Sequence, residues 1–128
     1  MVEGSAFVAA PSGGMTLAQM GAEVIRFDQL GGGIDYKRWP LTKDGVSLYW
    51  NGLNRGKKSV VADLRAPEIQ SLLSELIANS GNFLTNFPSK GWLSYEKLSE
   101  KRSDLVMVSI MGSHDGTTAV DYTINCAV

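Results

Sequence analysis

The chain has 128 residues, of which 44 % are apolar, so it is long enough and apolar enough for one globular domain with a hydrophobic core. Its net charge of −1 gives no long-range attraction to nucleic acid or to an anionic membrane, so we expect neither as a partner. The single cysteine, Cys126, excludes an internal disulfide and a cysteine-rich metal site.

The two ends of the chain look abrupt. Residues 1–10 lack the basic and long apolar regions of a signal peptide, and no apolar run approaches the ~20 residues of a membrane span. We therefore expect a cytoplasmic protein. The chain opens in what reads as a strand and closes on the apolar Tyr122–Val128 without a stop signal. We expect truncation at both ends, the alternative being a short domain with buried ends.

Short apolar strands alternate with helical patterns. The small apolar residues Ser5–Ala10 precede Pro11, which permits a helix start, and Gly21 is a good stop for that helix. Val24–Phe27 reads as a buried strand that ends at Asp28. A glycine-rich loop follows.

The clearest helix is Pro67–Ala78, which has proline at its start and apolar residues at helical spacing. Leu105–Ile110 has the composition of a parallel strand that is apolar on both faces. The other expected elements are strands at Ser59–Ala62 and Asn82–Thr85, helices at Tyr95–Arg102 and Asp121–Val128, and an ambiguous aromatic segment at Ser47–Leu53. This alternation predicts an α/β fold with a parallel sheet and flanking helices.

Ligands of open parallel sheets bind beyond the carboxyl ends of the strands. Four segments occupy such positions: Asp28–Gly33, Asp63–Arg65, Asn86–Lys90 and Met111–Asp115. Asp28 could bind a ribose hydroxyl of a dinucleotide, but Gly31–Gly33 follows the acid and no G-x-G-x-x-G turn precedes it. A tight glycine turn at the surface is the simpler interpretation.

Three further segments carry candidate chemistry. The basic Asn54–Ser59 could bind phosphate, although it is not a P-loop, and a solvated turn explains it equally well. In Asn86–Trp92, two rings and a lysine could hold a purine and a phosphate, as could an ordinary loop. His114 and Asp115 are adjacent, which argues against a triad with Ser113, because triad members converge from different segments. One histidine and one cysteine give little support for a metal site.

Taken together and in order, these segments resemble the family III CoA-transferases, the CaiB/BaiF family. The segments that carry the resemblance are Pro11 after a strand, Met20–Asp28 before Gly31–Gly33, Arg38–Trp39, Ser47–Tyr49, Asn54, Lys57–Ser59, Asp63–Arg65, Pro67–Glu68, Asn86–Phe87 and Leu105–Ser109. The resemblance implies a Rossmann-like CoA-binding portion, residues 1–128, of a longer chain that forms an interlocked homodimer. It also implies acyl-CoA and a carboxylate acceptor as substrates, with no permanently bound cofactor.

In the family, an aspartate attacks the thioester and forms a mixed anhydride and then an enzyme-bound CoA thioester. The resemblance implies that this nucleophile lies beyond Val128, so we expect no catalytic residue within the chain. Asp121 matches an earlier family aspartate that is not the nucleophile. The racemases of the family have an acid/base histidine where this chain has Val120, which argues against racemase chemistry.

The resemblance also implies which residues contact CoA: Phe7, Val8, Gln29, Ala62, Arg65, Asn86, Phe87 and Lys90. This chain departs from the family at Gln29, where arginine is frequent, and at Lys90, where formyl-CoA transferase has arginine in a longer loop. Residues 2–13 and 112–128 look most like the mesaconyl-CoA C1–C4 CoA-transferase branch, also described as 2-methylfumaryl-CoA isomerase. A non-catalytic CoA- or nucleotide-binding fragment is the alternative from another functional class.

Overall fold

The computed structural model describes residues 1–115, 117, 119 and 126. The elements in chain order are β1 (Val2–Gly4), α1 (Ala9–Gln19), β2 (Ile25–Gln29), α2 (Leu48–Leu53), β3 (Lys58–Ala62), α3 (Pro67–Ser80), β4 (Asn82–Thr85), the 3-10 turn η1 (Gly91–Leu93), α4 (Tyr95–Ser99) and β5 (Val106–Ser109). The expected helix at Asp121–Val128 lies outside the described residues.

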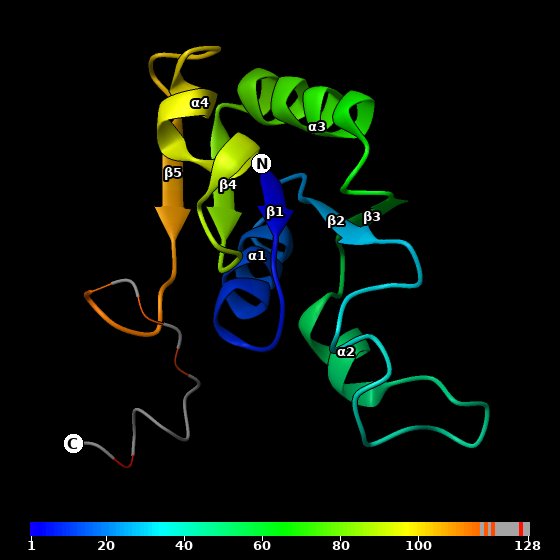
Figure 1. Ribbon diagram of the computed structural model, residues 1–128. Coiled ribbons are helices and arrows are strands. Elements are labelled where there is room, and N and C mark those ends of the chain that lie inside the picture. Colours follow the sequence, from blue (N-terminus) through cyan, green and yellow to red (C-terminus); the bar gives the residue numbers. More distant parts are fainter. Residues whose placement is uncertain (116, 118, 120–125, 127–128) are drawn as a thin grey trace.

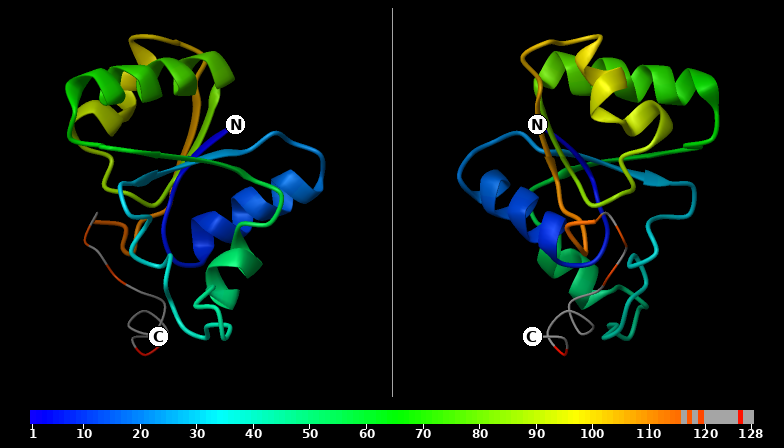
Figure 2. Two further views of the ribbon diagram at one scale, coloured as in Figure 1. Left: turned by 90° about the vertical axis from the view of Figure 1, so that its right-hand side faces the viewer. Right: turned by 60° about the vertical axis from the view of Figure 1, so that its left-hand side comes forward.

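The strands form one parallel sheet in the order β3-β2-β1-β4-β5 (Figure 1). The pairing places Val2 opposite Ile25 on one side and opposite Phe83 on the other, which makes β1 the central strand. In Figure 2, α3 and α4 lie on one face of the sheet and α1 lies on the other, with α2 beside it. The α/β class and the parallel sheet predicted from the sequence are confirmed.

Local chemistry explains the helix ends. Pro67 begins α3 with its ring, Glu68 lies in the positive first turn, and Gly81 ends the helix with φ of 72°, a conformation that glycine adopts without strain. Ser47 caps α2 by accepting a hydrogen bond from the Trp50 N–H at 3.0 Å. This cap resolves the ambiguity of the aromatic segment in favour of a helix.

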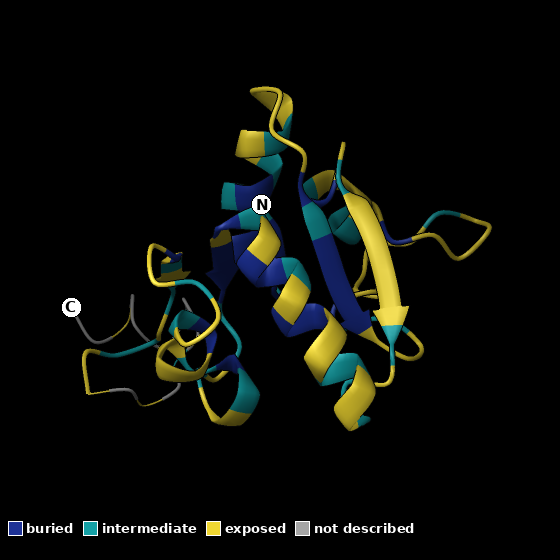
Figure 3. Cartoon of the chain, turned by 90° about the horizontal axis from the view of Figure 1, so that it is seen from above, coloured by how far each residue is buried: buried dark blue, intermediate teal, exposed yellow. Residues whose placement is uncertain are grey.

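The main core lies between the sheet and the layer of α3, η1 and α4. Its buried members are Val2, Phe27, Leu73, Ile77, Phe83, Leu93, Leu98 and Leu105. Phe27 and Phe83 stack with ring centroids 6.2 Å apart, which joins β2 to β4 across the shorter β1. Figure 3 shows the buried face of α3 turned toward the strands and its exposed face turned away.

Two strand predictions were wrong in detail. Asp28 does not end its strand, because β2 continues to Gln29 and pairs with β3 over its whole length. β5 is parallel, as expected, but it is not buried on both faces, since Val106 and Val108 are 58 % and 51 % exposed. β5 is an edge strand in the described part of the chain, and α1 covers the sheet nearer its centre.

Candidate functional site

All five strands are parallel, so their carboxyl ends lie at the same edge of the twisted sheet, and β1, β4 and β5 point downward in Figure 1. The strand order reverses between β1 and β4, because the chain moves outward from β1 to β3 and then returns to the other side of β1. This place is the topological switch point of the sheet. The loops that follow the two strands run in opposite directions there, and a crevice forms between them. The fold therefore predicts a ligand site beside the ends of β1 and β4.

A cavity of about 420 Å³ lies at this place. Its volume falls in the range of roughly 300–1,000 Å³ that is usual for ligand pockets. The lining residues come from loops after four strands: Ser5, Ala6, Phe7, Asp28, Gln29, Gly33, Ile34, Leu64, Asn86, Phe87 and Pro88. A second hollow of about 320 Å³ lies against β4 and β5 on the face that carries α1, away from the carboxyl ends of the strands.

The structure brings half of the predicted CoA-contacting residues together around the cavity. Phe7, Gln29, Asn86 and Phe87 line it. The other four lie beside the lining without being part of it: Val8 follows Phe7, Ala62 and Arg65 flank Leu64 in the chain, and Lys90 lies two residues beyond Pro88. The contact of all eight residues with CoA stays a prediction.

Both polar atoms of the Asn86 side chain form hydrogen bonds with the loop after β1. Its carbonyl oxygen accepts a hydrogen bond from the Ala6 N–H at 2.8 Å, and its Nδ2 donates to the Ala6 carbonyl at 2.7 Å. The preceding Thr85 donates from Oγ1 to the Gly4 carbonyl at 2.7 Å. The end of β4 thus holds the chain that leaves β1, across the crevice between the two strands. The role of Asn86 in this geometry is to fix the wall of the cavity.

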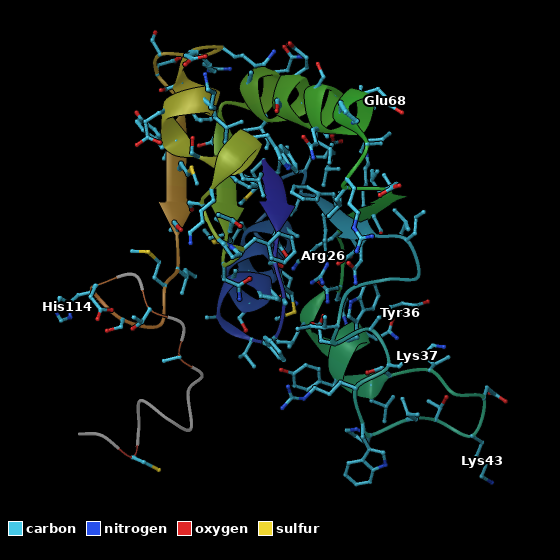
Figure 4. All side chains as sticks on the ribbon, in the orientation of Figure 1. Arg26, Tyr36, Lys37, Lys43, Glu68 and His114 are labelled. Carbon is cyan, nitrogen blue, oxygen red and sulfur yellow. The ribbon has the colours of Figure 1, made fainter. Side chains whose placement is uncertain are left out.

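Arg26 lies at the centre of a buried charged cluster under the cavity and is 1 % exposed (Figure 4). Its guanidinium donates to both carboxylate oxygens of Asp28, at 2.8 and 3.0 Å, and lies 3.5 Å from Asp35. Further bonds run to the Ser5 carbonyl at 2.9 Å and to Asn54 Oδ1 at 2.9 Å. Burial alone would lower the pKa of Arg26, but the hydrogen bond and the charge of Asp28, with Asp35 and Glu3, raise it.

Lys57 belongs to the same cluster. Its Nζ lies 2.8 Å from Glu3 Oε1, 2.8 Å from the Pro11 carbonyl and 2.9 Å from Asn54 Oδ1. Burial lowers the pKa of Lys57, and the bond and charge of Glu3 oppose that change. The basic segment Asn54–Ser59 therefore divides: Lys57 is engaged in the interior, and Lys58 pairs with Glu23 at the surface at 2.6 Å. This arrangement argues against Lys57 as a phosphate ligand.

The interpretation of Asp28 as a ribose anchor is not supported. Its carboxylate is 2 % exposed, and both of its oxygens accept hydrogen bonds from Arg26. Gly33 explains the glycine segment, because a Cβ there would lie 2.7 Å from Asp28 Oδ1 and 3.2 Å from Arg26 Nη2. The lack of a side chain at Gly33 lets the backbone pass closely over the ion cluster.

Sequence reasoning did not find the cluster of Glu3, Arg26, Asp35 and Lys57. One signal was present, since Arg26 and Asp28 are two residues apart in a strand and must point to the same face. A strand that carries two opposite charges on one buried face predicts an ion pair. Glu3 in β1 and Asp35 in the loop after β2 also contact Arg26, but no sequence pattern predicted this.

His114 lies in the loop after β5, exposed and well away from Arg26 in Figure 4. Its neighbour Asp115 accepts hydrogen bonds from the Thr117 N–H at 2.9 Å and Oγ1 at 2.7 Å, which lower the pKa of Asp115. Neither His114 nor Asp115 lines the cavity.

Val120 and Asp121 lie outside the described residues. Within residues 1–115, 117, 119 and 126, no three histidine, cysteine or acidic side chains gather as a metal site, and no helix there is long and apolar enough to cross a membrane.

Comparison with known proteins agrees with this geometry. The chain is 60 % identical over 98 % of its length to 2-methylfumaryl-CoA isomerase of Chloroflexus aurantiacus, and spans 32 % of that relative. It is 36 % identical over 88 % of its length to succinate–glutarate CoA-transferase of Agrobacterium fabrum, and spans 31 % of it. A CAIB/BAIF family protein from Brucella suis matches 98 % of the chain with a TM-score of 0.84 and 28 % identity, over 37 % of its own length.

The chain thus spans about a third of the relatives that it matches. The model of CoA-transferase family III matches residues 1–125, which is nearly the whole chain. The cavity at the switch point and the order of the sequence motifs agree with that match. The chain belongs to CoA-transferase family III.

Proposed function

We propose that this chain forms the CoA-binding part of an acyl-CoA CoA-transferase whose reaction is the intramolecular C1–C4 transfer on mesaconyl-CoA. The observation that carries the proposal is the cavity at the switch point, which gathers Phe7, Gln29, Asn86 and Phe87. The high identity to a relative named 2-methylfumaryl-CoA isomerase supports the choice of substrate. The family supports acyl-CoA as a substrate class.

The residues around the cavity suit the parts of CoA. Phe7 and Phe87 offer apolar surface for the adenine or the pantetheine arm. Arg65 and Lys90 are exposed next to the lining residues and carry charge for the phosphates. Helix α1 begins at Ala9, two residues after the lining residue Phe7, and has no side-chain cap, so the positive end of its dipole favours an anion beside the cavity.

The nucleophile in this proposal comes from polypeptide outside the chain, because Asp28, the carboxylate that lines the cavity, is bound to Arg26. An aspartate attacks the thioester carbonyl of mesaconyl-CoA and releases the CoA thiolate, which leaves a mixed anhydride. The thiolate then attacks the aspartyl carbonyl and frees the mesaconate carboxylate. The other carboxylate of the same mesaconate attacks this enzyme thioester, and the thiolate finally returns to the new anhydride at its mesaconyl carbonyl.

An intramolecular transfer requires the free mesaconate to stay in the site between these steps. The complete protein should therefore convert the C1 thioester to the C4 thioester, as followed by liquid chromatography with mass detection. With excess ¹³C-labelled free mesaconate present, the product should stay unlabelled. Label in the product would show transfer between molecules and refute the intramolecular reaction. No turnover of either kind would refute the transferase proposal.

CoA binding can be tested separately from turnover. Isothermal titration of the complete protein should show tighter binding of CoA than of NAD. Arg65→Ala should weaken CoA binding by about 1–3 kcal/mol if the guanidinium meets a phosphate. Lys97→Ala is the matched control, because Lys97 pairs with Glu100 on α4, away from the strand ends. An affinity for CoA that is unchanged in Arg65→Ala would remove Arg65 from the site.

A non-catalytic CoA-binding function is the second candidate, and it is favoured by the engagement of Asp28, the acid among the lining residues, with Arg26. It predicts CoA binding without turnover by the natural protein. Racemase chemistry would instead exchange an α-hydrogen of the acyl group with deuterated water.

We propose that the rest of the polypeptide and a second copy, as an interlocked dimer, complete the enzyme. The cytoplasmic setting stays a prediction.

A further inference from the structure

Phe7 has an unusual backbone conformation at the wall of the cavity. Its φ is 63°, in the left-handed region that non-glycine residues rarely adopt. Such conformations persist only where the surrounding structure imposes them, and they cluster at binding sites. The contacts that impose this conformation therefore identify residues that shape the site.

Two contacts hold the peptide groups on either side of Ala6. Asn86 binds both the N–H and the carbonyl of Ala6, as described above. The next N–H along the chain, that of Phe7, donates to Asp35 Oδ2 at 3.1 Å. Asp35 is 0 % exposed and comes from the loop after β2, so the wall is held from two separate elements.

Asp35 also touches the ion cluster, with its Oδ1 3.5 Å from Arg26 Nη2. Arg26 does not depend on that contact for neutralisation, because Asp28 already accepts two shorter hydrogen bonds from it. The shorter bond of Asp35 is the one to the Phe7 N–H, at 3.1 Å against 3.5 Å to Arg26. Its distinctive contribution is therefore to the backbone of Phe7.

This backbone decides where the lining of the cavity lies. Phe7 lines it, and its ring also lies under the guanidinium of Arg38, 5.5 Å from the ring centroid. A change of φ at Phe7 would move the ring and redirect the chain into α1. Asp35 itself does not line the cavity.

We propose that Asp35 is a positioning residue, which holds Phe7 in the left-handed conformation and thereby gives residues 5–8 the shape that binds CoA. The proposal rests on the proposed CoA-binding function. The first test is Asp35→Asn in the complete protein. The amide has one acceptor oxygen, and the charged guanidinium of Arg26 attracts it more strongly than the Phe7 N–H does, so the Phe7 N–H loses its acceptor.

We expect Asp35→Asn to raise the Kd for CoA at least tenfold by titration calorimetry, and to raise KM for the acyl-CoA with a smaller effect on kcat. Hydrogen exchange of the Phe7 N–H should become faster. Asp44→Asn, at an exposed position in the loop before α2, should change none of these values. An unchanged Kd and unchanged exchange in Asp35→Asn would overturn the proposal.

Phe7→Gly separates a positioning role from a general structural one, because glycine adopts positive φ without the clamp. In the Phe7→Gly background, Asp35→Asn should change the Kd by a much smaller factor than in the wild type. An equal factor in both backgrounds would show that Asp35 acts through Arg26 instead. If Asp35→Asn alone does not fold, recovery of folding in the double variant supports the proposal, and continued failure overturns it.

The outcome also separates the two proposals. A wild-type protein that binds no CoA would refute the proposed function, whatever the variants do. Faster exchange at Phe7 in Asp35→Asn would still support the positioning of the loop in that case. CoA binding that is equal in wild type and Asp35→Asn would refute the positioning role alone.

Discussion

The buried charge of Arg26 provides a direct test of how the site is held together. Arg26→Gln in the complete protein removes the cation that faces Asp28, Asp35 and Glu3, all of which are at most 2 % exposed. Lys57 remains beside Glu3 at 2.8 Å, so that acid keeps a partner. The formal charge of the cluster changes from −1, with three acids against two bases, to −2.

Removal of one partner from a buried ion pair typically destabilises a protein by about 3–5 kcal/mol, because the remaining charge is left without water or counter-charge. We expect a loss of that size from urea unfolding at pH 7. Lys58→Gln is the control, because Lys58 and Glu23 are 66 % and 64 % exposed. An exposed pair of this kind contributes at most about 1 kcal/mol. A loss no larger than that of Lys58→Gln would refute the conclusion that Arg26 neutralises buried acids.

Three further predictions concern helix α1, the loop after β4 and the edge strand β5. Gly14→Ala should destabilise the complete protein by about 1–3 kcal/mol in thermal or urea unfolding, because its Cβ would overlap the carboxylate of Glu3. Gly13→Ala, whose Cβ would meet only a Leu84 methyl at 3.3 Å, should be neutral or gain up to about 1 kcal/mol from helix propensity, and equal losses would contradict this packing. Asn86→Asp removes the donor to the Ala6 carbonyl and should weaken CoA binding at least tenfold in a titration, whereas unchanged binding would show that the loop keeps its shape without that bond. Residues 1–128 expressed alone should aggregate or unfold without cooperativity and show no CoA transfer, because the apolar face of β5 is open; a monomer that melts cooperatively and turns over acyl-CoA would refute this expectation.

Local chemistry in the sequence was sufficient to predict several of the elements. The predicted strand Asn82–Thr85 coincides with the observed β4. Gly81 ends the preceding helix, and Phe83 and Leu84 form a short apolar run directly after it. Pro67 likewise fixed the start of α3. The rule that parallel strands place their ligands at the carboxyl ends then indicated the loops with Phe7, Gln29, Asn86 and Phe87, and these loops do surround one cavity.

The tertiary structure decided how those loops are held. The buried ion cluster joins residues from four separate segments: Glu3, Arg26, Asp35 and Lys57. Their spacing along the chain does not predict that they contact one another. The exposure of β5 likewise depends on its edge position, which the apolar composition of the strand does not reveal. Hydrophobic periodicity in the sequence predicts which face of its own helix or strand a residue occupies. Charge pairing and burial depend on which elements become neighbours, and only the folded arrangement of the strands fixes that.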